Sequence, residues 1–110
     1  MKLPGSEKAY IPLRKLTEYL LSETHPAGGS KALFFRSVGF GDDNVDLLHE
    51  GLMVVGRKED VKETESSPYG TKYIVEGKLA TPIGSYARIR TVWIVESGDD
   101  RPRFVTAYPV

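Results

Sequence analysis

His25 and Lys31 are the first side chains in the sequence whose types and spacing suit proton transfer or phosphate binding. Histidine has an ordinary pKa close to neutrality, so His25 could move a proton at physiological pH. It stands beside Pro26, at the expected end of a helix, where it could instead only cap carbonyl groups. Lys31 follows six residues later, beyond Gly28-Gly29, and could reach the same site or remain solvated.

Several familiar patterns for catalysis and ligand binding are absent. The chain has no cysteine, which excludes disulfides, thiolate zinc sites and a cysteine nucleophile. Its two histidines, His25 and His49, lack the spacing of a metal site, and His49 has the context of a surface residue. The acidic residues near position 42 do not follow a calcium loop, nor residues 27–31 a phosphate-binding loop. We therefore expect neither a metal nor a cofactor.

The charge balance argues against strong non-specific binding to nucleic acid. The chain of 110 residues has 15 basic and 15 acidic side chains, so no positive excess is available to neutralise phosphates. The distribution is less even than the sum, because four of the seven arginines fall within residues 88–103. A local basic face would explain this grouping, and a solvated strand edge is the commoner explanation.

Length and hydropathy predict one domain without a membrane span. A chain of this length suits a single domain, residues 1–110, with one hydrophobic core. No apolar run exceeds four residues, which excludes a transmembrane helix. The N-terminal residues lack the apolar segment of a signal peptide, so we expect a cytoplasmic protein.

The first half of the chain has the pattern of two to three helices. Apolar residues at helical spacing predict a first helix over residues 12–24, which the next proline must end. Ser30 is a suitable N-cap for a second helix over residues 31–38, and Gly39 predicts a Schellman ending. A third helix is expected from residue 42 or 43 to about residue 55, with a buried stripe formed by Val45, Leu48, Leu52 and Val55.

The second half has the pattern of four strands. From about residue 60 the hydrophobic period changes from 3.6 to 2, which predicts strands at residues 61–65, 71–79, 86–96 and 103–108. Short turns between them favour an antiparallel meander, with the last strand at an edge. We therefore predict an α+β fold in which the helical half, residues 1–58, covers one face of the sheet half, residues 59–110.

Alternation along the last two strands predicts which side chains share a face. One set would be buried, namely Ile89, Trp93, Val95, Val105 and Ala107, with Thr91 as the single polar residue among them. The other set would lie on the opposite face, namely Arg88, Arg90, Thr106 and Tyr108, with Val92, Ile94 and Phe104. We expect that second face to be partly open, and cationic and rich in hydroxyl groups at one end.

Five ordered segments carry a family resemblance: KLTEYLL at 15–21, HP at 25–26, KALFF at 31–35, GF at 39–40 and RFVTAYP at 103–109. Together they resemble a family of small bacterial domains of unknown function, over nearly the whole chain. More distantly, the chain is similar to the superfamily of barnase, EndoU, colicin ribonucleases and RelE-like toxins. In that superfamily one or two helices precede a four-stranded antiparallel sheet.

The distant resemblance implies RNA cleavage without a metal ion. The positions that match are His25, Lys31, Arg88, Arg90, Thr106 and Tyr108. In this hypothesis His25 deprotonates a ribose 2′-hydroxyl, and Arg90 with Arg88 or Lys31 stabilises the charge that develops on the phosphate. Thr106 and Tyr108 would hold the phosphate in place.

A second hypothesis is a non-catalytic protein-interaction module, of an antitoxin-like or phage-accessory kind. The edge strand that ends at Val110 would then pair with a strand of a partner or of a second copy, forming a dimer. The sequence leaves open whether the protein is an enzyme. The partners it predicts are an RNA or a protein.

Overall fold

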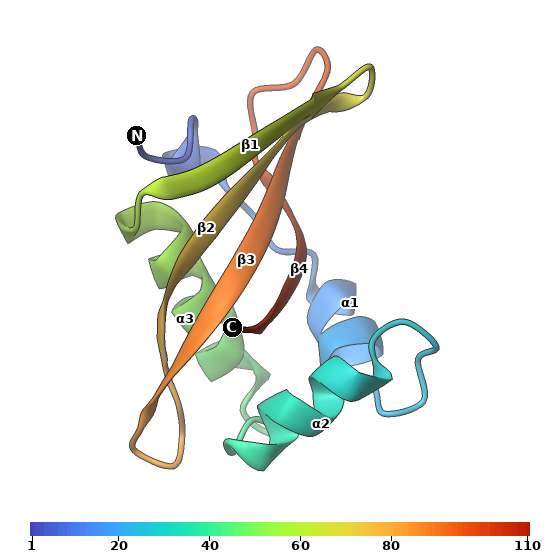
Figure 1. Cartoon of the computed structure of the whole chain (residues 1–110). Helices are drawn as coiled ribbons and strands as arrows, with labels where there is room; N and C mark the ends of the chain where they lie inside the picture. The colour runs from blue at the N-terminus through green and yellow to red at the C-terminus, as the bar shows by residue number, and fades with distance from the viewer.

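The computed structural model describes residues 1–110 as short helices followed by a four-stranded antiparallel sheet (Figure 1). The helical part contains η1 (Ser6–Lys8), α1 (Leu13–Lys15), the π-helical turn η2 (Leu16–Leu20), α2 (Gly29–Ser37) and α3 (Val45–Lys58). The sheet has the order β1 (Val61–Ser67), β2 (Gly70–Ala80), β3 (Tyr86–Glu96) and β4 (Arg103–Pro109). The predicted α+β class and meander order are confirmed. No helix combines the length and hydropathy needed to cross a bilayer.

The end of α2 follows the sequence prediction. Gly39 has a φ of 103°, a left-handed conformation that favours glycine. The Phe40 N–H donates to the Phe35 carbonyl at 3.1 Å, and the Gly39 N–H donates to the Arg36 carbonyl at 3.1 Å. These are the two hydrogen bonds of a Schellman motif, and the rings of Phe35 and Phe40 complete it with centroids 6.3 Å apart.

The predicted first helix is too long at its C-terminal end. Its last helical residue is Leu20 instead of Thr24. The Leu21 N–H donates to the Leu16 carbonyl at 2.9 Å, five residues back, which widens the last turn into a π-helix. Such turns disturb the regular helix and are frequent at functional sites.

The starts of the second and third helices also differ from prediction. Ser30 is not the N-cap of α2, because the helix already begins at Gly29. The third helix begins at Val45, after residues 42 and 43. Asn44 closes the preceding turn, since its Oδ1 accepts from the Gly41 N–H at 2.7 Å and its Nδ2 donates to the Gly39 carbonyl at 3.0 Å. These side-chain bonds favour a turn over an earlier helical start.

The predicted register of β3 against β4 is half correct. Arg90 lies opposite Tyr108, and Trp93 is fully buried on the other face, as expected. A bulge at Val105 then shifts the pairing, so that Trp93 lies opposite Phe104. Phe104 is therefore in the core and Val105 is only half-buried, the reverse of the sequence prediction. One inserted residue changes the face of every side chain beyond it.

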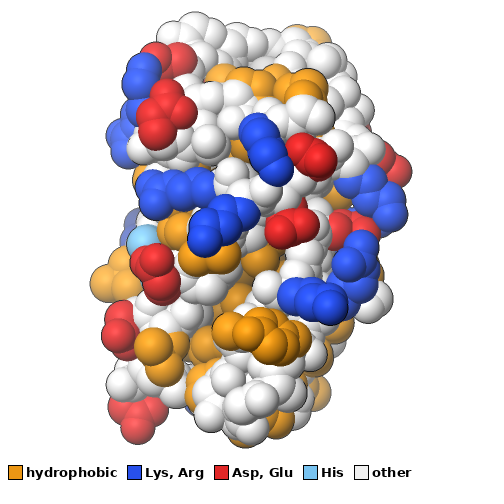
Figure 2. Space-filling model, turned by 90° about the vertical axis from the view of Figure 1, so that its left-hand side faces the viewer, with side chains coloured by type: hydrophobic (Ala, Val, Ile, Leu, Met, Phe, Trp, Pro, Cys, Tyr) orange, Lys and Arg blue, Asp and Glu red, His pale blue; other side chains and the backbone are white.

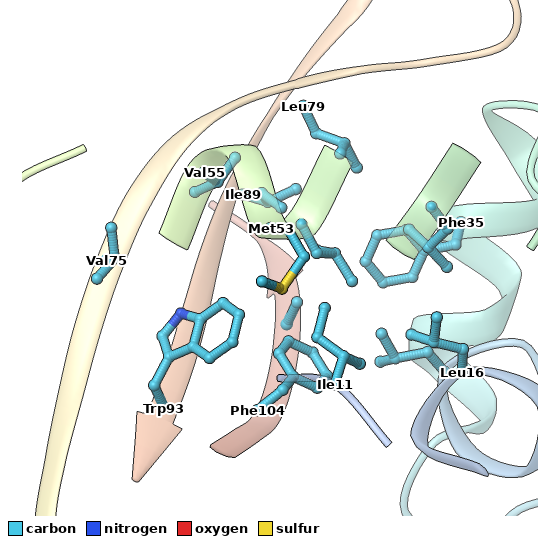
Figure 3. Packing of buried hydrophobic residues seen from close by; sticks show 14 of the residues in the cluster. Ile11, Leu16, Phe35, Met53, Val55, Val75, Leu79, Ile89, Trp93 and Phe104 are labelled. Atoms are coloured by element: carbon cyan, nitrogen blue, oxygen red, sulfur yellow. The ribbon is translucent and has the colours of Figure 1, made fainter. Parts of the chain in front are cut away.

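Aromatic packing explains why the core accepts that bulge. The rings of Trp93 and Phe104 meet edge to face, with centroids 5.4 Å apart (Figure 3). Gly56 of α3 lies directly against the indole. Thr91 shares this core face and is fully buried. Its hydroxyl donates to the Val75 carbonyl at 2.7 Å and accepts from the indole N–H at 2.8 Å. The hydrogen-bonding capacity of this buried hydroxyl is thus satisfied.

The N-terminal segment covers part of the edge that the sequence predicted to be free. The Tyr10 N–H donates to the Pro102 carbonyl, and the Phe104 N–H donates to the Tyr10 carbonyl, each at 3.0 Å. Tyr10 therefore pairs in parallel beside β4, while α1 and α2 lie past the other end of that strand (Figure 1). This bridge occupies only the start of β4, so strand pairing through the rest of that edge stays a prediction.

Candidate functional site

Tyr19 joins the two halves of the molecule at the junction of the helices with β4. It lies in the π-helical turn η2, whose Leu16 and Leu20 are fully buried, while Tyr19 itself is only half-buried. Its hydroxyl is 2.9 Å from Oγ1 of Thr106 in β4. Gly28 packs against the Tyr19 carbonyl, where a Cβ would come within 2.5 Å of the oxygen. Only glycine permits this close approach.

Three basic side chains surround the Tyr19 ring. The ammonium groups of Lys15 and Lys31 lie 5.0 and 5.6 Å from the ring centroid, within the range of cation–π attraction. The His25 ring meets it edge to face at 5.1 Å. Neither lysine has a carboxylate within 4 Å, so their charge is not neutralised by an ion pair. We name this group, Lys15, Tyr19, His25, Lys31 and Thr106, the Tyr19 cluster.

His25 holds the loop that precedes α2. Its Nδ1 accepts hydrogen bonds from the backbone N–H groups of Ala27 and Gly28, at 3.0 and 3.1 Å. The neutral ring therefore carries its proton on Nε2. In this geometry His25 can donate a hydrogen bond through Nε2, whereas acting as the base would require a lone pair that neither nitrogen has free. The sequence hypothesis had assigned it the base.

Two hollows border the Tyr19 cluster. The first, of about 340 Å³, is lined by Pro12, Arg14, Lys15, Glu18, Tyr19 and His25. The second, of about 460 Å³, is lined by Ser30, Lys31, Tyr108 and Pro109. Lys31 lines the second hollow and lies over the ring that lines the first, so the two hollows are neighbours.

Arg90 lies on the sheet next to Tyr108, one of the residues that line the second hollow. It is paired across the strands with Tyr108, and hydrogen bonding to Glu76 first and to Tyr108 second raises its pKa above the usual value. The Arg90 side chain is 25% exposed, so it is accessible to a ligand while these contacts hold it. Tyr108 thus connects Arg90 to Lys31.

A second basic group lies around a single carboxylate on the open face of the sheet. Glu76 is only 6% exposed, and its Oε2 accepts from the Arg90 guanidinium at 2.6 and 2.7 Å. Its Oε1 is 3.2 Å from the Lys62 ammonium and 3.4 Å from the Arg88 guanidinium. Hydrogen bonding from Arg90 is the largest cause of the lowered pKa of Glu76. We name this group, Lys62, Glu76, Arg88 and Arg90, the Glu76 cluster.

The structure brings most of the sequence-predicted site residues together. His25, Lys31 and Thr106 meet around Tyr19, and Tyr108 and Arg90 extend the group along the sheet. Arg88 is separate from it, since it contacts Glu76 and lies opposite Lys78, and neither of these residues lines the two hollows. Lys15 and Tyr19 were not among the site residues predicted from the sequence. Their spacing of four residues, which puts both on one helix face, was the available signal.

The remaining surface offers no metal site and one apolar groove. No group of three or more His, Cys, Asp or Glu side chains could hold a metal ion. A groove of about 480 Å³ lies between α3 and the β2–β3 hairpin, with Leu47, Val54 and Tyr86 among its exposed apolar residues. On the side that carries β1 and α3, basic and acidic groups are mixed and hydrophobic groups gather towards the lower end (Figure 2).

Comparison with known proteins identifies a structural relative and a family. No curated protein matches the sequence. The fold is similar to a chain of the contact-dependent growth inhibition toxin–immunity protein complex from Klebsiella pneumoniae 342, with a TM-score of 0.72 and 18% identity over 97% of each chain. At this identity the likeness concerns the fold. The model of a domain of unknown function, DUF6883, matches residues 2–110, and the chain therefore belongs to that family.

Proposed function

We propose that the protein is a ribonuclease of toxin type that cleaves RNA without a metal ion. The observation that carries the proposal is the meeting of Lys31 and Tyr108 at one hollow, with Arg90 paired to Tyr108 and the Tyr19–Thr106 contact nearby. Cations and hydroxyl donors fixed in advance around one space are what phosphoryl chemistry requires, because they stabilise the charge that develops in the transition state. The similarity to a chain of a toxin–immunity complex supports a toxin-type role.

The cleavage would use the RNA's own 2′-hydroxyl as nucleophile. Its oxygen attacks the adjacent phosphorus and loses its proton to water, the bond to the 5′-oxygen breaks, and that oxygen leaves as a hydroxyl after taking a proton from water. A 2′,3′-cyclic phosphate remains. Lys31 and Arg90 stabilise the added negative charge on the phosphate oxygens, and Thr106 and Tyr108 orient them. His25 contributes as a donor through Nε2. This order of events matches that of the barnase and colicin ribonuclease superfamily, which the sequence distantly resembles.

The direct test is cleavage of single-stranded RNA by the purified chain with a chelator present. We expect products that end in 2′,3′-cyclic phosphate, best seen at low ionic strength because the net charge of zero gives little general attraction. Arg90→Ala should lower kcat/KM by about 10²-fold, as lost transition-state stabilisation, and Tyr108→Phe by less.

Lys62→Ala is the matched control for the arginine variant. This variant also removes one positive charge that pairs with Glu76, but Lys62 lies away from both hollows. The Lys62→Ala protein should therefore cleave RNA like the unmodified protein. Absence of cleavage across varied RNA substrates would reject the ribonuclease assignment.

A second candidate function is an immunity-type binding protein without catalysis. The complex that contains the structural relative holds both a toxin and an immunity protein, and the apolar groove beside α3 is an exposed surface of the kind that partners cover. An inactive protein whose groove variant Leu47→Asp loses a co-purifying toxin would favour this function.

A further inference from the structure

The first hollow has a lining that suits a ligand, and the proposed cleavage uses only His25 among the residues of that lining. Its volume of about 340 Å³ falls within the range of small-molecule sites. Arg14 and Glu18 in its wall neutralise each other through a contact of 3.1 Å. Lys15 is left without a carboxylate partner, beside the half-buried ring of Tyr19. The hollow therefore offers one free positive charge and one aromatic surface.

The two hollows are joined through a single contact. The Lys31 ammonium lines the second hollow and lies 5.6 Å from the ring of Tyr19, which lines the first. A ligand that fills both must cross between Lys15 and Lys31, and so should carry negative charge at its midpoint. Two ring systems joined by a phosphodiester have this pattern of aromatic, anionic and aromatic parts.

We propose that Lys15, Tyr19 and the first hollow form a second nucleotide subsite, next to the subsite where cleavage occurs. A single-stranded RNA then lies across the Tyr19–Lys31 contact, with one nucleotide in each hollow. The proposal rests on the proposed function and adds the path of the RNA across the protein surface. It requires unpaired nucleotides, because only these can turn their bases onto an aromatic side chain.

Binding of a non-cleavable strand tests this subsite independently of catalysis. We would measure the fluorescence anisotropy of a labelled 2′-deoxy single strand over a series of salt concentrations. Lys15→Ala should weaken binding by about tenfold at low salt, the value of a hydrogen bond to a charged group. It should also reduce the salt slope by about 0.7, the loss of one phosphate contact in a single strand.

Lys72→Ala is the control, since Lys72 is an exposed lysine of β2 outside both hollows. It should leave the affinity and the salt slope unchanged. A duplex of the same sequence should bind less tightly than the single strand. In the cleavage assay, Lys15→Ala should raise KM and leave kcat unchanged, because it alters binding at a distance from the reacting atoms.

The outcomes separate this subsite from the proposed function. Binding that depends on Lys15, without any cleavage, would retain the subsite and reject the ribonuclease. Cleavage in which Lys15→Ala and Lys72→Ala behave alike would retain the ribonuclease and overturn the subsite. Absence of single-strand binding, or equal binding of duplex, would also overturn the subsite.

Discussion

The Tyr19 cluster and the Glu76 cluster are two basic regions of one neutral protein, and they differ in whether a carboxylate neutralises their positive charge. In the Glu76 cluster three cationic side chains converge on one carboxylate that is 6% exposed. In the Tyr19 cluster two lysines and a histidine converge on an aromatic ring instead. A ring attracts cations only weakly, by about 0.5–1 kcal/mol at exposed sites, and leaves their charge available.

The comparison shows why the net charge misleads here. A total of zero hides one region where positive charge is satisfied and another where it is free. An incoming phosphate would have to compete with Glu76 for Arg88 and Arg90, whereas at Lys15 and Lys31 it meets no carboxylate competitor. Arg90 belongs to the Glu76 cluster and is paired with Tyr108, which lines the second hollow, so it connects the Glu76 cluster to the candidate site.

The largest effect should come from the core on which both regions rest. Trp93→Ala removes a fully buried ring between Gly56 and Phe104, and should lower the free energy of unfolding by about 3–5 kcal/mol. Urea unfolding followed by circular dichroism measures this change. A loss below about 1 kcal/mol would mean that the indole is not part of the core.

The next largest effect should separate the two roles of His25. His25→Ala removes both the ring and the acceptor for the Ala27 and Gly28 N–H groups, and should lower the cleavage rate by about 10²-fold. His25→Asn replaces the Nδ1 acceptor by an amide oxygen and removes Nε2. It should restore thermal stability and leave the rate low. Full activity in the asparagine variant would show that His25 only shapes the loop.

A smaller and pH-dependent effect is expected at Glu76. Glu76→Gln should destabilise the protein by about 1 kcal/mol near neutral pH, because two of the three basic partners are more than half exposed. The pKa of Glu76 is lowered in the folded protein. The stabilisation of the fold by the Glu76 carboxylate is therefore present above its ordinary pKa of 4.5 and is lost as the pH falls below that value.

The gap in unfolding free energy between Glu76→Gln and the unmodified protein should therefore shrink as the pH falls below 4.5, when both are followed by urea unfolding. The variant should also bind the single strand more tightly, because Arg88 and Arg90 are released. An unchanged affinity would show that the carboxylate does not restrain the two arginines.

The smallest effect is expected from Tyr19→Phe. This change removes the contact with Thr106 at 2.9 Å and keeps the ring that gathers the cations. Stability should fall by about 1 kcal/mol or less, as for one hydrogen bond. Binding of the non-cleavable strand should stay nearly the same while the cleavage rate falls, because Thr106 loses its orientation. A large loss of binding would assign the hydroxyl, rather than the ring, to the ligand.

Local patterns predicted much of the fold. The change of hydrophobic period near residue 60 indicated the α+β class, because helices and strands bury residues at different spacings. Gly39 and Phe40 predicted the end of α2, since the Schellman motif involves only neighbouring residues. The π-helical turn at Leu16–Leu20 escaped prediction because a bond from residue 21 to residue 16 leaves no mark in residue types.

The sequence alone determined which residue types were available for chemistry and, through strand alternation, that Arg90 and Tyr108 share one face. Only the tertiary structure decided that Phe104 enters the core at the bulge, because its fit against Trp93 is a contact between strands. Only the tertiary structure brought Tyr19 to Thr106. Packing of the helices against the sheet closes the long loop between these residues, and no local pattern records which surface residues then meet.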